Sequence, residues 1–160
     1  MIRSAIVGDA KQICNIYNFY VLNTIVTFEE DAVPEEEMRS RIENITSKFP
    51  WIIYETNGKI KGYAYASEWK SRCAYKHSVE TTVYLLNGAH GNGIGSKLYA
   101  ELIKRLREMN IHALIGGISL PNDASIALHE KFGFKKIGQF EEVGFKFDKW
   151  IDVGYWELKF

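Results

Sequence analysis

The sequence predicts an α/β fold in which a mixed sheet carries helices on both faces. First, segments with strand periodicity alternate along the chain with amphipathic segments of helical periodicity. Second, a glycine-rich turn joins a predicted strand, Thr81–Leu86, directly to a long helix that ends near Met109. Third, 160 residues with 46% hydrophobic side chains fit one domain with an ample core. We therefore expect a single domain over residues 1–160.

The N-terminal part is expected to form a strand and two helices. Ile2–Val7 predicts the strand. Asp9 is placed to cap a helix that runs to about Leu22, because a carboxylate can accept from free N–H groups at a helix start. Pro34 and the three glutamates after it predict a second helix, since proline suits the first turn and negative charge favours the positive end of the helix dipole.

A hairpin is expected next. Trp51–Glu55 and Ile60–Trp69 predict two strands joined at Asn57-Gly58, a dipeptide that strongly favours a two-residue hairpin turn. The polar stretch Lys70–His77 separates this hairpin from the strand that carries Glu80.

The C-terminal half is expected to complete the sheet. The long helix presents one apolar stripe, made of Leu98, Leu102, Ile103, Leu106 and Met109. Gly138 and Gly144 predict irregularities in the strand that contains them. The other expected elements are the strand Ala113–Leu120, a short helix capped at Pro121–Asp123 and stopped by Gly133, and the strands Phe134–Phe147 and Val153–Phe160.

The composition excludes several classes of function. Twenty basic and twenty acidic residues cancel, which argues against nucleic acid or a membrane as partner. No apolar run approaches the roughly 18 residues of a membrane span, and the chain starts without a signal peptide, so we expect a cytoplasmic location. Cys14 and Cys73 form no Cys-x-x-Cys pair, and the four histidines lack metal-site spacing. We expect reduced thiols and no metal.

The glycine-rich turn before the long helix is a candidate phosphate site. Its glycines permit backbone conformations closed to other residues and clear side chains from the helix start. Free N–H groups and the helix dipole then favour a phosphate or pyrophosphate. A tight turn without a ligand is the alternative. The candidate cofactor-binding residues are Gly91, Asn92, Gly93, Ile94, Gly95 and Ser96.

Two common phosphate motifs do not fit this turn. A P-loop needs glycine followed by Lys and then Ser or Thr, whereas Gly95 is followed by Ser96-Lys97. The dinucleotide fingerprint would place its third glycine at Ser96, and no acidic ribose ligand stands about 20 residues further on.

In its strand–turn–helix setting, the segment His90–Gly95 resembles the Q/R-x-x-G-x-G/A motif of the GNAT superfamily of acetyl-CoA-dependent N-acetyltransferases, with His90 in place of Gln or Arg. The resemblance implies the GNAT fold over nearly the whole chain, with acetyl-CoA as cosubstrate. It also implies that the fourth and fifth strands splay apart to admit the pantetheine arm. Backbone N–H groups of Val83, Tyr84 and Leu85 would then stabilise the developing oxyanion.

Within that superfamily the chain resembles the phosphinothricin acetyltransferases, which acetylate glufosinate and related methionine sulfoximine or sulfone compounds. The first shared block, Trp69–Tyr84, is close to W-K-x-R-x-A-Y followed by x-E-x-(S/T)-V-Y. The second block, Leu120–Glu130, is close to L-P-N-D-x-S-x-x-x-H-E. The third, Gly144–Trp156, is close to G-F-K…W-x-D-V-G-F-W.

These blocks contain two candidate catalytic residues. An α-amine titrates near about 8, so a carboxylate in a partly desolvated cleft can deprotonate it, and Glu80 is the candidate base. A solvent-facing or ion-paired Glu80 is the alternative. His129 lies where many GNAT enzymes have a tyrosine that protonates the departing thiolate. An imidazolium at His129 can donate to the sulfur and a neutral imidazole can orient Glu80, and the sequence leaves both roles open.

The resemblance also names contacts for the two substrates. Lys70, Arg72 and Tyr75 match acceptor-binding positions, and such cations suit an amino acid with a second, tetrahedral anionic or polar end. Phe28 matches an acceptor-pocket phenylalanine, with a core or lid role as the alternative. Asn122 matches a cofactor contact and is also placed to cap the short helix.

The function expected from the resemblance is acetyl transfer from acetyl-CoA to the α-amine of a small glutamate- or methionine-like acceptor, by direct attack. The alternatives are a GNAT enzyme that acts on another amine, such as a polyamine or a peptide N-terminus, and a non-catalytic acyl-CoA sensor. The aromatic C-terminal segment and the resemblance together predict a homodimer with acceptor pockets near the interface.

Overall fold

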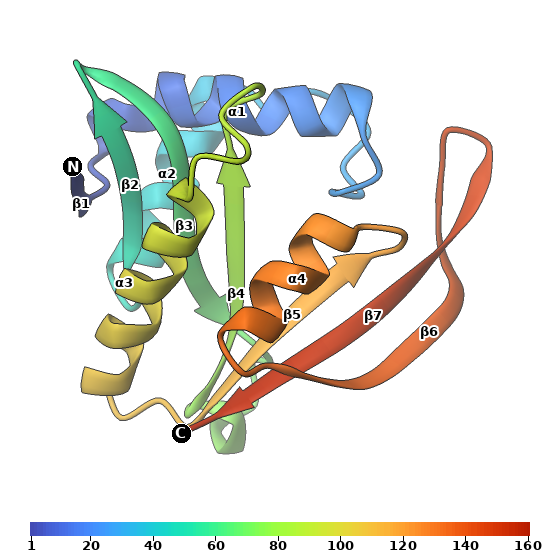
Figure 1. Cartoon of the computed structure of the whole chain (residues 1–160). Coiled ribbons are helices and arrows are strands. Elements are labelled where there is room, and N and C mark those ends of the chain that lie inside the picture. Colours follow the sequence, from blue (N-terminus) through green and yellow to red (C-terminus); the bar gives the residue numbers. More distant parts are fainter.

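A computed structural model describes all 160 residues. It contains one seven-stranded sheet and four α-helices (Figure 1). The strands are β1 (Ile2–Ser4), β2 (Trp51–Thr56), β3 (Lys59–Glu68), β4 (Ser78–Leu85), β5 (Ala113–Ser119), β6 (Lys135–Lys146) and β7 (Lys149–Lys159), and the helices are α1 (Ala10–Asn23), α2 (Glu35–Thr46), α3 (Ile94–Glu108) and α4 (Asp123–Lys131). The strand order is β1-β2-β3-β4-β5-β7-β6.

The centre of the sheet is split. Every neighbouring pair of strands is antiparallel except β4 and β5, which run parallel. These two strands pair only over Ser78–Glu80 with Ala113–Ile115, although β4 continues to Leu85 and β5 to Ser119. Figure 1 shows them diverging from their shared start. The predicted mixed sheet and its splayed central strands are confirmed.

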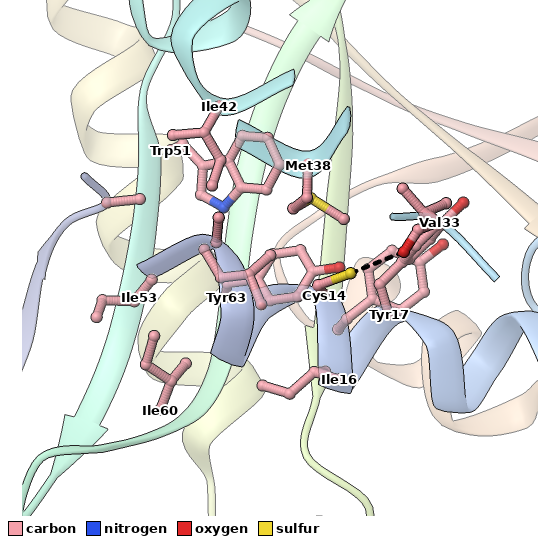
Figure 2. Packing of buried hydrophobic residues seen from close by; sticks show 14 of the residues in the cluster. Cys14, Ile16, Tyr17, Val33, Met38, Ile42, Trp51, Ile53, Ile60 and Tyr63 are labelled. Carbon is pink, nitrogen blue, oxygen red and sulfur yellow. Dashed lines mark hydrogen bonds between the residues drawn. The ribbon is translucent and has the colours of Figure 1, made fainter. Parts of the chain in front are cut away.

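Two apolar cores cover the two faces of the sheet. Side chains of β2 point alternately to the two faces of the sheet and therefore contribute to both cores. Trp51 and Ile53 belong to the core beneath α1 and α2, whereas Ile52 belongs to the core beneath α3 and α4. Figure 2 shows the first core, where the thiol of the buried Cys14 donates to the Val33 carbonyl at 2.9 Å. This bond ties α1 to the segment that leads into α2.

The structure corrects the start of the chain. β1 ends at Ser4, and a 3-10 turn over Val7–Asp9 takes the place of the rest of the predicted strand. Asp9 precedes α1 but makes no capping hydrogen bond to it. Its carboxylate instead accepts from the Arg3 guanidinium at 2.7 and 2.8 Å and from the Ile6 N–H at 2.9 Å. The predicted cap is wrong because a nearby cation and an earlier amide take both carboxylate oxygens.

The structure also corrects two boundaries near the long helix and the last strand. Met109 is 43% exposed because α3 ends at Glu108, so the apolar stripe stops at Leu106. β7 begins at Lys149, before the predicted Val153, because its first residues pair with the end of β6.

The β6–β7 hairpin extends beyond the helical layers (Figure 1). Its pairing shifts between Lys136 and Gly138 and again between Phe140 and Gly144. The predicted irregularities at the two glycines are therefore confirmed.

Candidate active site

A cavity of about 290 Å³ lies where β4 and β5 separate. Glu80 from β4, Gly117 from β5 and His129 from α4 line it, together with Asn122 at the start of α4. Thr27, from the loop between α1 and α2, adds a further part of the wall. The split in the sheet thus brings the two candidate catalytic residues to one space.

Glu80 is the last residue of β4 that pairs with β5. A Cβ atom at Gly117 would lie 3.4 Å from Glu80 Oε1, so the carboxylate approaches a strand surface that carries no side chain. Glu80 takes part in none of the ion pairs of the structure. Burial raises the pKa of Glu80, and the positive charge of Lys70 partly offsets that rise. The ion-paired alternative therefore does not describe this carboxylate.

His129 is only 4% exposed, and both of its ring nitrogens are occupied. Nδ1 lies 2.7 Å from the Ser125 carbonyl and Nε2 lies 2.7 Å from the Tyr99 hydroxyl. A carbonyl can only accept, so Nδ1 carries the proton and Nε2 accepts from Tyr99. Burial lowers the pKa of His129, which favours this neutral form. Thr81 Oγ1, 2.9 Å from the Tyr99 hydroxyl, extends the chain of hydrogen bonds.

Two adjacent glycines of β5 make room for the two candidate catalytic side chains. A Cβ at Gly116 would lie 2.3 Å from His129 Nε2, which is closer than any real contact, so glycine is required there. Successive residues of a strand point to opposite faces, so Gly116 faces His129 and Gly117 faces Glu80. The hydrogen bonds of His129 run to Tyr99 and Ser125, and neither joins it to Glu80.

A second cavity, of about 450 Å³, lies at the N-terminus of α3. Gly91 and Gly93 line it with φ angles of +81° and +71°, a left-handed backbone that side chains disfavour. No side chain caps the helix, so its first amides stay available for an anion. Gly95 differs from this expectation, because it lies within the first turn of α3 and has no positive φ.

The two cavities adjoin. Four residues line both cavities: Val26, Val83, Asn122 and Ser125. The Asn122 side chain accepts from the Ser125 N–H at 3.1 Å, so Asn122 caps α4 at the junction. Of the other predicted β4 contacts, Tyr84 lines the first cavity and Leu85 the second.

Several residues at the site carry no distinctive sequence signal. Lys131 of α4 lines the second cavity, and its Nζ lies 2.9 Å from Ser96 Oγ. The hydroxyl of Tyr20, on α1, donates to the Leu85 carbonyl at 2.7 Å and lies 3.3 Å from His90 Nε2. Tyr99 lies on the apolar face of α3, a position whose sequence pattern indicates a core residue and gives no sign of its hydrogen bond to His129.

The predicted acceptor contacts lie outside the walls of the first cavity. Lys70, Arg72 and Tyr75 are exposed between β3 and β4, and only Lys70 affects the Glu80 pKa. Phe28 is 41% exposed and packs against Gly144 of β6. The structure therefore gathers Glu80, His129 and Asn122 around the first cavity, and leaves the predicted acceptor contacts outside it.

Two further observations concern metal binding and membrane insertion. No group of three or more His, Cys, Asp or Glu side chains is arranged to hold a metal ion. None of the helices combines the length and the hydropathy that a membrane crossing requires.

A mixed sheet split between parallel central strands, with an uncapped helix start beside the split, defines the GNAT class of acyl-CoA-dependent transferases. Residues 2–154 match the family described as acetyltransferase (GNAT) domain. The chain belongs to this family and is an acetyl-CoA-dependent N-acetyltransferase.

Known relatives support this assignment. An L-methionine sulfoximine/L-methionine sulfone acetyltransferase of Salmonella typhimurium is 33% identical over 99% of this chain and 93% of its own length. The crystal structure of a GNAT superfamily phosphinothricin acetyltransferase from Sinorhizobium meliloti, in complex with acetyl-CoA, is 35% identical, with a TM-score of 0.96 over 99% of this chain and 87% of that one. A structure named ribosomal-protein-alanine N-acetyltransferase, from Brucella melitensis, is 37% identical, with a TM-score of 0.97 over 100% and 99% of the two chains.

Proposed function

We propose that the protein transfers the acetyl group of acetyl-CoA to the α-amine of a small amino-acid-like acceptor of the phosphinothricin, methionine sulfoximine or methionine sulfone type. The observation that carries this proposal is the unpaired carboxylate of Glu80, which is desolvated in a cavity next to the site at the start of α3. The names of the Salmonella and Sinorhizobium relatives support the class of acceptor.

Glu80 acts as the general base. Burial raises the pKa of Glu80, which makes its carboxylate a stronger base than that of an exposed glutamate. An α-amine that titrates near about 8 needs no stronger base. Glu80 takes the amine proton directly or through one water molecule, and Lys70 limits the rise of the Glu80 pKa.

The second cavity fits the diphosphate of acetyl-CoA. The amides at the start of α3 are uncapped, and Lys131 adds a cation beside Ser96. When bound, acetyl-CoA supplies an activated acyl group. The amides of Val83 and Leu85 are the proposed donors for negative charge that develops on the acyl oxygen, since Val83 lines both cavities and Leu85 lines the second. The Tyr84 N–H points to the other edge of β4, toward β3, as does the Leu86 N–H that donates to the Lys61 carbonyl. His129, neutral and bonded to Tyr99, shapes the wall that the acyl group meets.

A second acceptor class has support from one observation. The Brucella structure is named ribosomal-protein-alanine N-acetyltransferase, so the amine of an alanine in a peptide, such as an N-terminal alanine, is the competing acceptor. The small volume of the first cavity, about 290 Å³, favours a free amino acid over a peptide.

The decisive assay measures thiol release with acetyl-CoA and a panel of amines. Phosphinothricin, methionine sulfone and methionine sulfoximine are compared with simple amino acids, a polyamine and an alanine-terminated peptide. We expect turnover by the first group to exceed the others. Preferred turnover of the peptide or polyamine would replace the proposed acceptor. Binding of acetyl-CoA without turnover of any amine would favour the sensor alternative.

We also propose a homodimer that is formed through the β6–β7 hairpin. The hairpin and its turn expose large apolar side chains at a density unusual for a free surface. They are Ile137, Phe140, Val143, Phe145, Phe147 and Trp150. Light scattering should give twice the chain mass of 18.4 kDa, and a monomer at micromolar concentration would contradict this proposal.

A further inference from the structure

Lys146 is a buried cation that the proposed chemistry does not use. It lies at the end of β6 and is 2% exposed. Its Nζ donates to the Val21 carbonyl at 2.7 Å and to the Thr27 carbonyl at 2.8 Å. Val21 lies in the last turn of α1, where carbonyls lack helical partners and the helix dipole favours a positive charge. Lys146 therefore joins the end of α1 to the loop that follows it.

This loop, residues 24–34, forms part of the cavity that holds Glu80. Val26 and Thr27 line that cavity together with Tyr17 of α1. Thr27 Oγ1 lies 2.8 Å from the Tyr17 hydroxyl, which donates to Glu29. These contacts hold the side chain of Thr27, whereas Lys146 binds the backbone carbonyl of the same residue.

Arg41 completes the attachment on the α2 side. Its guanidinium binds both carboxylate oxygens of Glu29, at 2.9 and 2.6 Å. Such a two-point contact fixes direction as well as distance. The loop is thus attached to α1, to α2 and to the β6–β7 hairpin.

A second contact joins the same loop to the same hairpin. The Phe28 ring lies so close to Gly144 that a Cβ there would be 2.4 Å from Phe28 Cζ. Gly144 adjoins the second register shift of β6, two residues before Lys146. The hairpin therefore contacts the loop at two points: the buried ammonium of Lys146 binds the Thr27 carbonyl, and the backbone of Gly144 packs against the Phe28 ring.

We propose that Lys146 is a positioning residue for the acceptor, because it holds Val26 and Thr27 in place as a wall of the acceptor site. This inference rests on the proposed function. The second cavity shares only Val26 with this loop, and its proposed anion site is built from the turn before α3, the start of α3 and α4. Loosening the loop should therefore weaken acceptor binding selectively.

The test compares Lys146→Met with Lys135→Met, a matched control at an exposed lysine of the same strand. Thiol release gives kcat and the two KM values for each variant. Lys146→Met should raise the KM for the acceptor about tenfold, as expected for loss of hydrogen bonds from a charged donor, and leave the KM for acetyl-CoA within about twofold. Gly144→Ala, which displaces Phe28, should change the same KM in the same direction. The control should match the wild type.

Hydrogen exchange tests the contact without turnover. Amides of residues 24–34 should exchange faster in Lys146→Met than in the wild type, whereas amides of α3 should not change. Unchanged kinetics in folded Lys146→Met, or equal rises of both KM values, would overturn the proposal. If Lys146→Met fails to fold, Gly144→Ala decides, and an unchanged acceptor KM there overturns it. A wild type without acetyl transfer would refute the proposed function, and hydrogen exchange would then still decide whether Lys146 orders the loop.

Discussion

Tyr99 donates its hydroxyl proton to Nε2 of His129 across 2.7 Å, at a site where Tyr99 has no exposed surface. Because Nδ1 of His129 donates to the Ser125 carbonyl, the ring is held as one neutral tautomer. His129 therefore has no free ring nitrogen for a substrate in this arrangement, and a role as proton donor requires Tyr99 to release it.

The first prediction concerns Tyr99→Phe. The change leaves the buried Nε2 of His129 without a donor, so we expect a loss of about 1–3 kcal/mol in the free energy of unfolding. Urea denaturation measures this loss. Long-range proton–nitrogen NMR of the wild type should show His129 protonated on Nδ1 at neutral pH. A signal from the Nε2–H tautomer would contradict the assigned hydrogen bonds.

The second prediction concerns Gly116→Ala. The added Cβ would lie 2.3 Å from His129 Nε2, so the imidazole must shift from the position in which it accepts from Tyr99. Overpacking of this kind costs about 1–3 kcal/mol. The variant should be less stable in thermal unfolding and should have a lower kcat. Gly138→Ala is the control, because a Cβ at Gly138 meets no atom within 4 Å.

The third prediction concerns Glu80→Gln. Loss of the base should lower kcat by about 10²- to 10⁴-fold, while calorimetry should show acetyl-CoA affinity close to that of the wild type. Equal losses of turnover and affinity would indicate a structural role for Glu80.

Glu80→Gln should also change the pH dependence of stability. The pKa of Glu80 is raised above 4.5 in the folded chain, so the folded chain holds this proton more tightly than the unfolded chain does. The cost of burying the charge is fully present above the folded-state pKa and vanishes below the unfolded-state pKa. Glu80→Gln should therefore unfold at a higher temperature than the wild type near neutral pH, and the difference should disappear as the solution is acidified. A difference that does not depend on pH would contradict the assigned shift.

The fourth prediction concerns Lys131→Ala. Removal of this cation from the second cavity should raise the KM for acetyl-CoA about tenfold and leave the acceptor KM unchanged. The effect should shrink as salt is added, because salt screens an exposed charge. Lys104→Ala, on the exposed face of α3, is the control. An acetyl-CoA KM that stays at the wild-type value in Lys131→Ala would show that Lys131 does not contribute to acetyl-CoA binding.

Local patterns predicted most of the fold. The hairpin at Asn57-Gly58 and the irregularities at Gly138 and Gly144 depend on backbone conformations that nearby residues dictate, and these positions agree with the structure. The cap at Asp9 failed because its partner, Arg3, lies on another element. Although Arg3 is only six positions away, the 3-10 turn between them brings the two side chains together, and the spacing alone does not predict that turn.

The candidate site was predictable only where residues form motifs. Glu80, His129 and Asn122 belong to recognisable blocks, and the structure brings all three to one cavity. Tyr99 and Lys146 contribute buried polar groups from elements whose patterns indicate core and strand. Their partners lie 30 and 125 positions away in the chain, so the tertiary fold alone defines their roles.

The pairing of β4 with β5 stops after Glu80, although β4 continues to Leu85 with β3 on its other side. The peptide groups of β4 that face the gap therefore have no strand to complete their ladder. An extended molecule that carries amide groups can lie in the gap as an additional strand and form hydrogen bonds with these free peptide groups of β4. Occupancy of the gap should then raise the melting temperature of the whole chain, so that the enzyme is most resistant to heat while it is loaded.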